Sequence, residues 1–149
     1  VAKGMEFLNA PYETIQKVTE ELVRSDGERY CFSKSQEEVD TLLWEAQLKY
    51  VFPLVENYRR YFVKKYYDFI KAALPINNGY GDQVMVPEEA ELGNLMYLVE
   101  RGGIPVSAEE SMELKRYRKA RNELAHMNLL SNEELCVILK AGKHKTASD

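Results

Sequence analysis

Three Ser-x-x-Glu sequences that stand directly before a helical pattern divide this chain into helical segments: Ser35 to Glu38, Ser107 to Glu110, and Ser131 to Glu134. In such a capping box, the serine oxygen accepts a hydrogen bond from a backbone N–H of the first helical turn. The glutamate side chain in turn accepts one from the serine N–H. Apolar residues recur at helical spacing after each box. The sequence therefore predicts helices that begin directly after these three serines.

Two helices are expected in the first part of the chain. One runs from about Pro11 to Val23 and ends at a turn formed by residues 25–27. After a loop or brief extended segment at residues 29–33, the second helix follows Ser35. Its apolar residues form a stripe that is expected to face the core: Val39, Leu42, Leu43, Ala46 and Tyr50.

Pro53 lies within a pattern that is otherwise continuously helical. Proline lacks a backbone N–H and crowds the preceding turn, so it either kinks this helix or starts a new one. Beyond it, apolar and aromatic residues continue at helical spacing as far as Leu74-Pro75: Leu54, Tyr58, Tyr61, Phe62, Phe69 and Ile70.

The rest of the chain is expected to form a long loop and three helices. Residues 75–86 are rich in turn formers and predict a loop, and Pro87 sits at a helix start. The stripe of that helix is ended by Gly102-Gly103, the Ser107 box opens the next helix, and Gly142 ends the last one. The residues expected to be buried on these helices are Leu92, Leu95, Met96, Val99, Met112, Tyr117, Ala120, Leu124, Leu135, Ile138 and Leu139.

The predicted fold is an all-α, up-and-down bundle of five to six helices. No alternating β pattern is sustained, and nothing repeats at a solenoid period. At 149 residues the chain has the length of one domain, expected over residues 5–142. The polar residues 143–149 are expected to be a disordered tail.

Composition narrows the function classes. A formal net charge of −4 excludes a wholly basic nucleic-acid binder but permits a local basic face. No apolar run reaches the length of a membrane span, and no secretory signal is recognisable. Cys31 and Cys136 are too few for a disulfide framework, and no Cys/His cluster has zinc-ligand spacing. A cytoplasmic protein without metal or cofactor is expected, and the start at Val1 fits a domain cut from a longer protein.

Basic residues are concentrated on two segments of this acidic chain. Residues 113–121 carry five of them against Glu113 alone: Lys115, Arg116, Arg118, Lys119 and Arg121. A second basic segment, residues 58–67, is also rich in aromatic side chains. Such concentration is typical of a phosphate-bearing partner, although charge runs on helices are commonly solvated faces and tyrosines at helical spacing are commonly core. His144 is expected to be a solvated group of the tail, whereas His126 follows the first basic segment directly.

The segment Tyr117-Arg-Lys-Ala-Arg-Asn-Glu-Leu-Ala-His126 resembles the motif of the HEPN domains. These small helical bundles share an R-x(4–6)-H motif, often with a polar residue directly after the arginine. Here the motif is Arg121-Asn122 followed by His126, late in a helical chain of the expected size. The likeness covers the motif and the helical architecture and assigns no subfamily.

The resemblance implies a metal-independent ribonuclease whose composite site forms where two motifs meet in a homodimer. Carried over by position, Arg121 and His126 would be catalytic and Asn122 would orient them. The neighbouring cations would bind RNA phosphates: Arg118, Lys115, Lys119 and Arg116. RNA, not DNA, is the expected partner, in a toxin–antitoxin, defence or RNA-processing setting. Some toxin-type members carry a tyrosine two residues after the histidine, where this chain has Asn128.

The resemblance equally leaves open a non-catalytic role. Other HEPN-like modules dimerise, dock partners within a larger protein, or bind a nucleotide without turnover.

Helix geometry sets a condition on this site. Side chains five residues apart on a straight helix diverge by roughly 140°. Arg121 and His126 can therefore share a target only if the helix ends before His126 or if two chains contribute. Residues at i, i+4 and i+8, in contrast, line one stripe: Arg118, Asn122 and His126.

Overall fold

The computed structural model describes residues 35–145, with side chains as far as Gly142. The chain divides into two compact units, Val1–Glu45 and Ala46–Asp149, and the fold below is that of the second. The helix expected from Pro11 to Val23 and the segment 29–33 lie outside the described residues, as does the side chain of His144.

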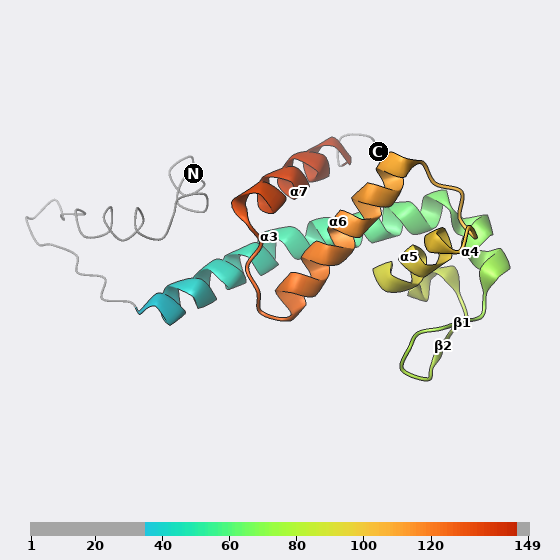
Figure 1. The fold of residues 1–149 in the computed structure, drawn as a ribbon, viewed down its shortest axis with the longest axis horizontal. Coiled ribbons are helices and arrows are strands. Elements are labelled where there is room, and N and C mark those ends of the chain that lie inside the picture. The colour runs from blue at the N-terminus through green and yellow to red at the C-terminus, as the bar shows by residue number, and fades with distance from the viewer. Residues whose placement is uncertain (1–34, 146–149) are drawn as a thin grey trace, which may run out of the picture. The chain divides into compact units, whose positions relative to one another are not determined.

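Five α-helices, packed together with a small β-hairpin, make up the described part of the chain (Figure 1). The predicted helical architecture is thus confirmed, and the small two-stranded hairpin is an addition to it that the sequence did not predict. The elements in chain order are α3 (Gln36–Lys65), α4 (Tyr67–Ala73), β1 (Ile76–Asn77), β2 (Gln83–Val84), the short 3-10 helix η1 (Pro87–Glu89), α5 (Leu92–Glu100), α6 (Ala108–Ala125) and α7 (Asn132–Lys145). None of the helices within residues 35–145 is long and apolar enough to cross a membrane.

All three capping boxes form, so the predicted helix starts are confirmed. At Ser107, the Glu110 N–H donates to the serine Oγ at 3.1 Å and the serine N–H donates back to the glutamate at 3.4 Å. The boxes that open α3 and α7 have the same pair of hydrogen bonds. Each box satisfies N–H groups that a helix start would otherwise leave unpaired.

Helix α3 continues through Pro53, so no new helix begins there. Pro53 is exposed, and so is Lys49, whose carbonyl loses its helical donor and can be hydrated instead. The break comes later, at Tyr66 between α3 and α4, where the Tyr66 N–H still donates to the Phe62 carbonyl at 3.0 Å.

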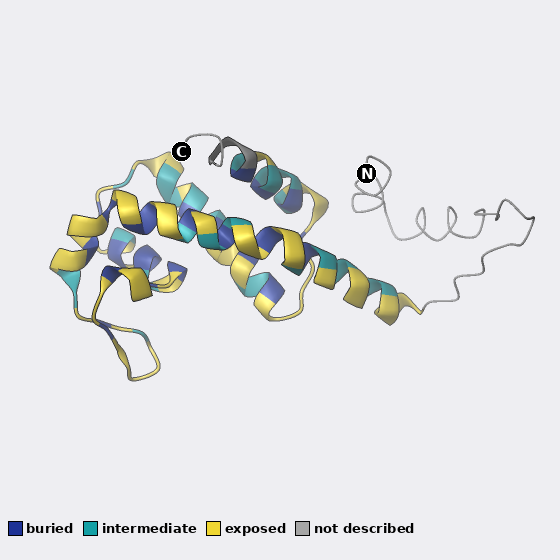
Figure 2. Ribbon diagram, turned by 180° about the vertical axis from the view of Figure 1, so that it is seen from behind, coloured by how far each residue is buried: buried dark blue, intermediate teal, exposed yellow. Residues whose placement is uncertain are grey.

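The buried face of α3 differs from the predicted stripe. The residues buried against the other helices of the second unit are Gln47, Val51, Val55, Tyr58, Phe62 and Val63, whereas Tyr50 is exposed. In Figure 2 the outer face of this helix is lined with exposed residues. Tyr58 stacks on Tyr117 of α6, with ring centroids 4.0 Å apart and planes at 8°. Tyr117, Ala120 and Leu124 are buried as predicted, but Met112 is exposed.

Residues 75–86 were expected to be one loop, yet they contain the β1–β2 hairpin. The strands are antiparallel, with Ile76 opposite Val84 and Asn77 opposite Gln83. Ile76 and Val84 are buried, but strands of two residues are too short to produce an alternating pattern in the sequence. Pro87 opens η1, and α5 starts only after Glu91, which forms a capping box with Asn94.

Gly142 was expected to end the last helix, but α7 continues to Lys145. The reason for the glycine is close packing, since a Cβ at this position would lie 2.7 Å from Cδ2 of Leu54 on α3. The first three residues of the expected tail, 143–145, are thus helical. By contrast, Gly102 does end α5 as predicted, with a φ of 75°.

Candidate functional site

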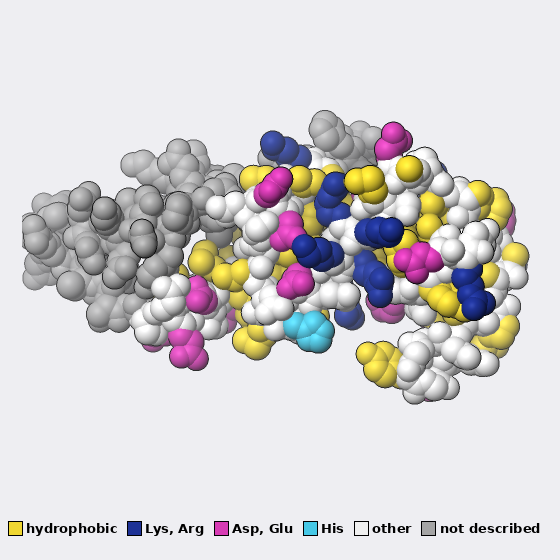
Figure 3. All heavy atoms as spheres, in the orientation of Figure 1, with side chains coloured by type: hydrophobic (Ala, Val, Ile, Leu, Met, Phe, Trp, Pro, Cys, Tyr) yellow, Lys and Arg dark blue, Asp and Glu magenta, His cyan; other side chains and the backbone are white. Residues whose placement is uncertain are grey.

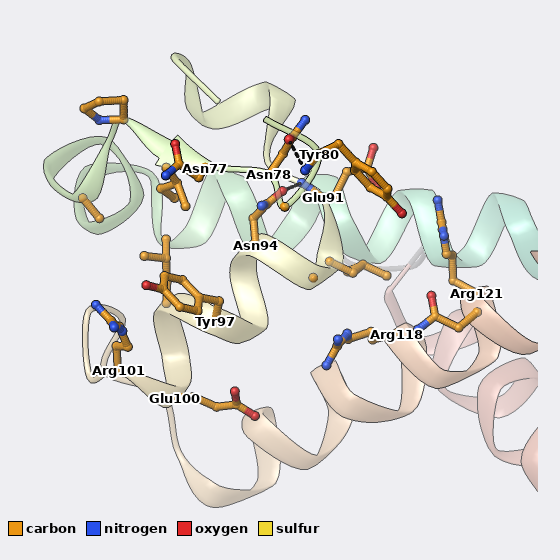
Figure 4. A pocket seen from close by; sticks show the side chains of 18 of the residues that line it. Asn77, Asn78, Tyr80, Glu91, Asn94, Tyr97, Glu100, Arg101, Arg118 and Arg121 are labelled. Atoms are coloured by element: carbon orange, nitrogen blue, oxygen red, sulfur yellow. Dashed lines mark hydrogen bonds between the residues drawn. The ribbon is translucent and has the colours of Figure 1, made fainter. Parts of the chain in front are cut away.

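A pocket of about 1070 Å³ lies between the hairpin, α5 and the C-terminal half of α6 (Figure 4). Its lining residues come from three segments that are distant in sequence, namely 73–80, 91–101 and 118–126. It is slightly larger than the range of about 300–1,000 Å³ that is usual for small-molecule sites. The pocket therefore has room for part of a polymeric ligand as well as for a small one.

Four residues singled out from the sequence line this pocket together: Arg118, Arg121, Asn122 and His126. Asn122 is half-buried, whereas the two arginines and the histidine are exposed and open to a ligand. The stripe expected for Arg118, Asn122 and His126 therefore faces one cavity, and Arg121 faces the same cavity.

The end of α6 explains how His126 can share a cavity with Arg121. Helix α6 ends at Ala125, and His126 caps it with φ −95° and ψ 15°. The next residue, Met127, is left-handed at φ 60°. The Asn128 N–H donates to the Glu123 carbonyl at 2.9 Å, and the Met127 N–H donates to Leu124 at 3.2 Å. These bonds form a Schellman motif, which turns the chain away after the histidine. Of the two alternatives, a helix that ends before His126 is the one found.

Arg101 is a pocket residue that sequence reasoning missed. It follows α5 directly, and its guanidinium lies 4.8 Å from the ring centroid of Tyr97, which also lines the pocket. A cation over an aromatic face is held without losing its charge. In the sequence this arginine stands alone before Gly102-Gly103, and one isolated cation does not form a basic segment.

The charge of the pocket is set by its arginines. Arg101, Arg118 and Arg121 line it together with Glu91 and Glu100. The Glu91 side chain accepts from a backbone N–H of the first turn of α5, so its charge already has a partner in the helix start. The arginines outnumber the glutamates, so the net charge of the pocket lining favours an anion. The guanidinium groups also have the fork geometry that matches phosphate oxygens.

The other three predicted phosphate-binding residues, Lys115, Arg116 and Lys119, do not line the pocket. Lys119 forms a hydrogen-bonded ion pair with Glu134 of α7. The hydrogen bond raises the pKa of Lys119 and lowers that of Glu134. In the space-filling view, Lys and Arg side chains gather over α6 (Figure 3). The basic face of this helix is thus divided between the pocket and its outer surface.

Three of the four cations in the second basic segment, Arg59, Arg60 and Lys65, form ion pairs within the fold. Arg59 pairs with Glu56 at 2.7 Å and donates to the carbonyls of Glu88 and Ala90, while Arg60 also contacts Glu56. Lys65 forms an ion pair with Glu110, and Tyr66 donates to the same carboxylate at 2.6 Å. Tyr58 and Tyr66 are buried, as expected for core tyrosines, whereas Tyr61 and Tyr67 of the same segment are exposed.

Within the part of the chain that the structure describes, no group of three or more His, Cys, Asp or Glu side chains could hold a metal ion. Comparisons with protein-family models, with curated proteins and with solved structures give no match. The functional inference therefore rests on the chemistry of the pocket and on the motif at its edge.

Proposed function

We propose that this protein is a metal-independent endoribonuclease of HEPN type. The observation that carries the proposal is the convergence of Arg118, Arg121, Asn122 and His126 on one pocket. A guanidinium pair, an amide and an imidazole in one cavity are a set of groups that phosphodiester cleavage can use.

Each residue has a role in the proposed reaction. The 2′-hydroxyl of the substrate attacks the adjacent phosphorus, the bond to the 5′-oxygen breaks, and a 2′,3′-cyclic phosphate forms. His126 takes the proton from the 2′-hydroxyl or gives one to the leaving 5′-oxygen, because imidazole is the side chain that most often serves as general acid or base. Arg121 and Arg118 neutralise the charge of the pentacoordinate phosphorus. Asn122 is the positioning residue, and no metal is required because the nucleophile belongs to the substrate.

A homodimer would complete this chemistry. The reaction needs a proton acceptor and a proton donor, while each pocket contains His126 as its imidazole. Since His126 is exposed at the pocket edge, a two-fold related copy could bring a second one to the same phosphate. A cytoplasmic antitoxin, or further domains of a larger protein, would then control the site.

A second candidate is a module that binds a nucleotide without turnover. The pocket favours it because Tyr97, with Arg101 over its ring, and Asn94 lie on α5 beside the cationic residues. A non-catalytic docking module is the remaining alternative, with no pocket residue that points to it specifically.

The decisive experiment is an RNA cleavage assay in EDTA with the wild type and the Arg121→Ala, His126→Ala and Asn122→Ala variants. We expect cyclic-phosphate products from the wild type, and rates at least about 100-fold lower for the arginine and histidine variants, given the usual size of electrostatic and acid–base contributions respectively. Lys140→Ala is the matched charge control, since Lys140 is exposed on α7 and outside the pocket. Unchanged cleavage by His126→Ala would contradict the proposal.

Mixing tests the dimer. An excess of the His126→Ala chain added to wild type is expected to lower the wild-type rate, because mixed dimers would lack one imidazole. Binding of nucleotides without cleavage of any RNA would favour the second candidate instead.

A further inference from the structure

The pocket has two walls of different chemistry. The α6 wall carries the arginines, whereas the opposite wall carries aromatic and amide side chains from the hairpin and α5: Asn77, Asn78, Tyr80, Asn94 and Tyr97. In Figure 4 the side chain of Tyr80 extends from the hairpin across the pocket toward α6. A ligand with both a phosphate and a flat ring system would match both walls.

Tyr80 is presented to the solvent by a hydrogen-bonded turn. Tyr80 is 93% exposed, which is the highest exposed fraction of any large hydrophobic residue in the described part of the chain. It stands between Gly79 and Gly81, whose φ angles of 82° and 97° shape the turn. The Asn78 side-chain oxygen accepts from the N–H groups of Tyr80 at 3.0 Å and Asp82 at 3.2 Å. The ring is thus free on its faces while its backbone is held.

Tyr97, the other aromatic side chain of this wall, is in a different state. It is 43% exposed, and the guanidinium of Arg101 already lies over its ring at 4.8 Å. Tyr80 therefore offers the more accessible aromatic face to a ligand.

We propose that Tyr80 is a stacking platform for an unpaired base of single-stranded RNA, whose phosphate lies on Arg118 and Arg121. This inference rests on the proposed function and names the substrate class of the same pocket. A base within a duplex has neighbours on both faces, so it cannot stack on a side chain, whereas a single-stranded base can. At about 1070 Å³, the pocket has room for an unpaired nucleotide.

The test is fluorescence anisotropy with a 2′-O-methyl RNA oligonucleotide, which binds but has no free 2′-hydroxyl to react. The proteins are the wild type, Tyr80→Ala and Tyr80→Phe. We expect Tyr80→Ala to weaken single-strand binding roughly 5- to 150-fold, the range of one base–aromatic stack, and Tyr80→Phe to bind within about two-fold of wild type. The salt dependence is expected to be unchanged in both, because no phosphate contact is lost. The wild type should bind the matching duplex more weakly than the single strand.

Three results would overturn the stacking role: full affinity in Tyr80→Ala, an equal loss in Tyr80→Ala and Tyr80→Phe, or no RNA binding by the wild type. The two proposals fail separately. If the wild type binds the methylated strand with the expected Tyr80 dependence but never cleaves unmodified RNA, the stacking role stands and the nuclease falls. If it cleaves unmodified RNA and Tyr80→Ala leaves KM unchanged, the nuclease stands and the stacking role falls.

Discussion

The side-chain amide of Gln47 on α3 makes two hydrogen bonds to the backbone of Leu130 in the loop between α6 and α7. The Gln47 Nε2 donates to the Leu130 carbonyl at 3.2 Å, and its Oε1 accepts from the Leu130 N–H at 2.8 Å. Both bonds are buried. A single side chain thus satisfies both backbone polar groups of one loop residue and fixes the loop that follows His126.

Replacing this amide should be costly. In Gln47→Leu, two buried backbone groups lose their partners, and we expect the free energy of unfolding to fall by about 2 kcal/mol or more. Lys49→Leu is the control, because it introduces the same side chain at an exposed position of the same helix. Urea denaturation of both variants measures the difference. Equal stability of the two would show that the Leu130 bonds contribute little.

Two methionines with the same exposure should respond oppositely to glycine. Met112 and Met127 are each 62% exposed, but Met112 is inside α6 while Met127 has a φ of 60°. Met127→Gly is expected to stabilise the protein by up to about 1 kcal/mol, since glycine has no Cβ penalty in the left-handed region. Met112→Gly should destabilise it by about 1 kcal/mol. Thermal unfolding of the pair gives the comparison, and a loss of stability in Met127→Gly would argue against the Schellman geometry.

Two helical glycines form a second matched pair. Gly142→Ala brings a methyl group against Leu54 and is expected to destabilise by about 1–3 kcal/mol, the range for overpacking. Gly93→Ala on α5 meets open space and should stabilise by about 0.5–1 kcal/mol. In a Leu54→Ala background, the penalty of Gly142→Ala should disappear. A double-mutant cycle measures this coupling, and additive effects would rule out the Leu54 contact as the cause.

Acid should weaken the link between α3 and η1. Hydrogen bonds from Arg59, opposed in part by burial and helped by Arg60, lower the pKa of Glu56 from its ordinary value of 4.5 to about 2. A carboxylate whose pKa is lower in the folded than in the unfolded chain stabilises the fold at pH values above its unfolded pKa. This contribution is lost as the pH falls from about 4.5 to about 2. The urea midpoint of wild type should therefore fall more steeply over this window than that of Glu56→Gln. Parallel curves would contradict the role of this ion pair.

RNA binding should distinguish the pocket from the outer face of α6. If phosphates lie in the pocket, Arg118→Ala and Arg121→Ala should each reduce the slope of log affinity against log salt by about 0.7. Lys115→Ala and Lys119→Ala should change it less, because neither residue lines the pocket and Lys119 is paired with Glu134. Equal changes in all four would indicate that RNA follows the whole basic helix.

The elements that sequence reasoning located well are those whose chemistry is local. A capping box lies within four residues, so the starts of α3, α6 and α7 could be read from the chain. The buried face of α3 could not, because the buried Gln47 has its hydrogen-bond partner 83 residues away in the sequence. The end of α6 was left open for a related reason, since a methionine occupies the left-handed position that glycine usually marks.

The candidate site divides in the same way. The α6 side was found because Arg118, Arg121, Asn122 and His126 lie close together in sequence. Tyr80, Tyr97 and Arg101 were missed because only the fold brings the hairpin and α5 to the same cavity. Three further cations belong to the same basic segment of the sequence but do not line the cavity: Lys115, Arg116 and Lys119.

Because the cavity is assembled from three segments of the chain, its shape depends on a hairpin with strands of only two residues each. Such a short ladder opens more easily than the helices behind it. A ligand that contacted both the hairpin and α6 would hold the two elements together and reduce the opening of the hairpin. Amide hydrogen exchange in residues 76–84 should then slow on binding while exchange in α3 stays as it was, so occupancy can be followed even when no reaction takes place.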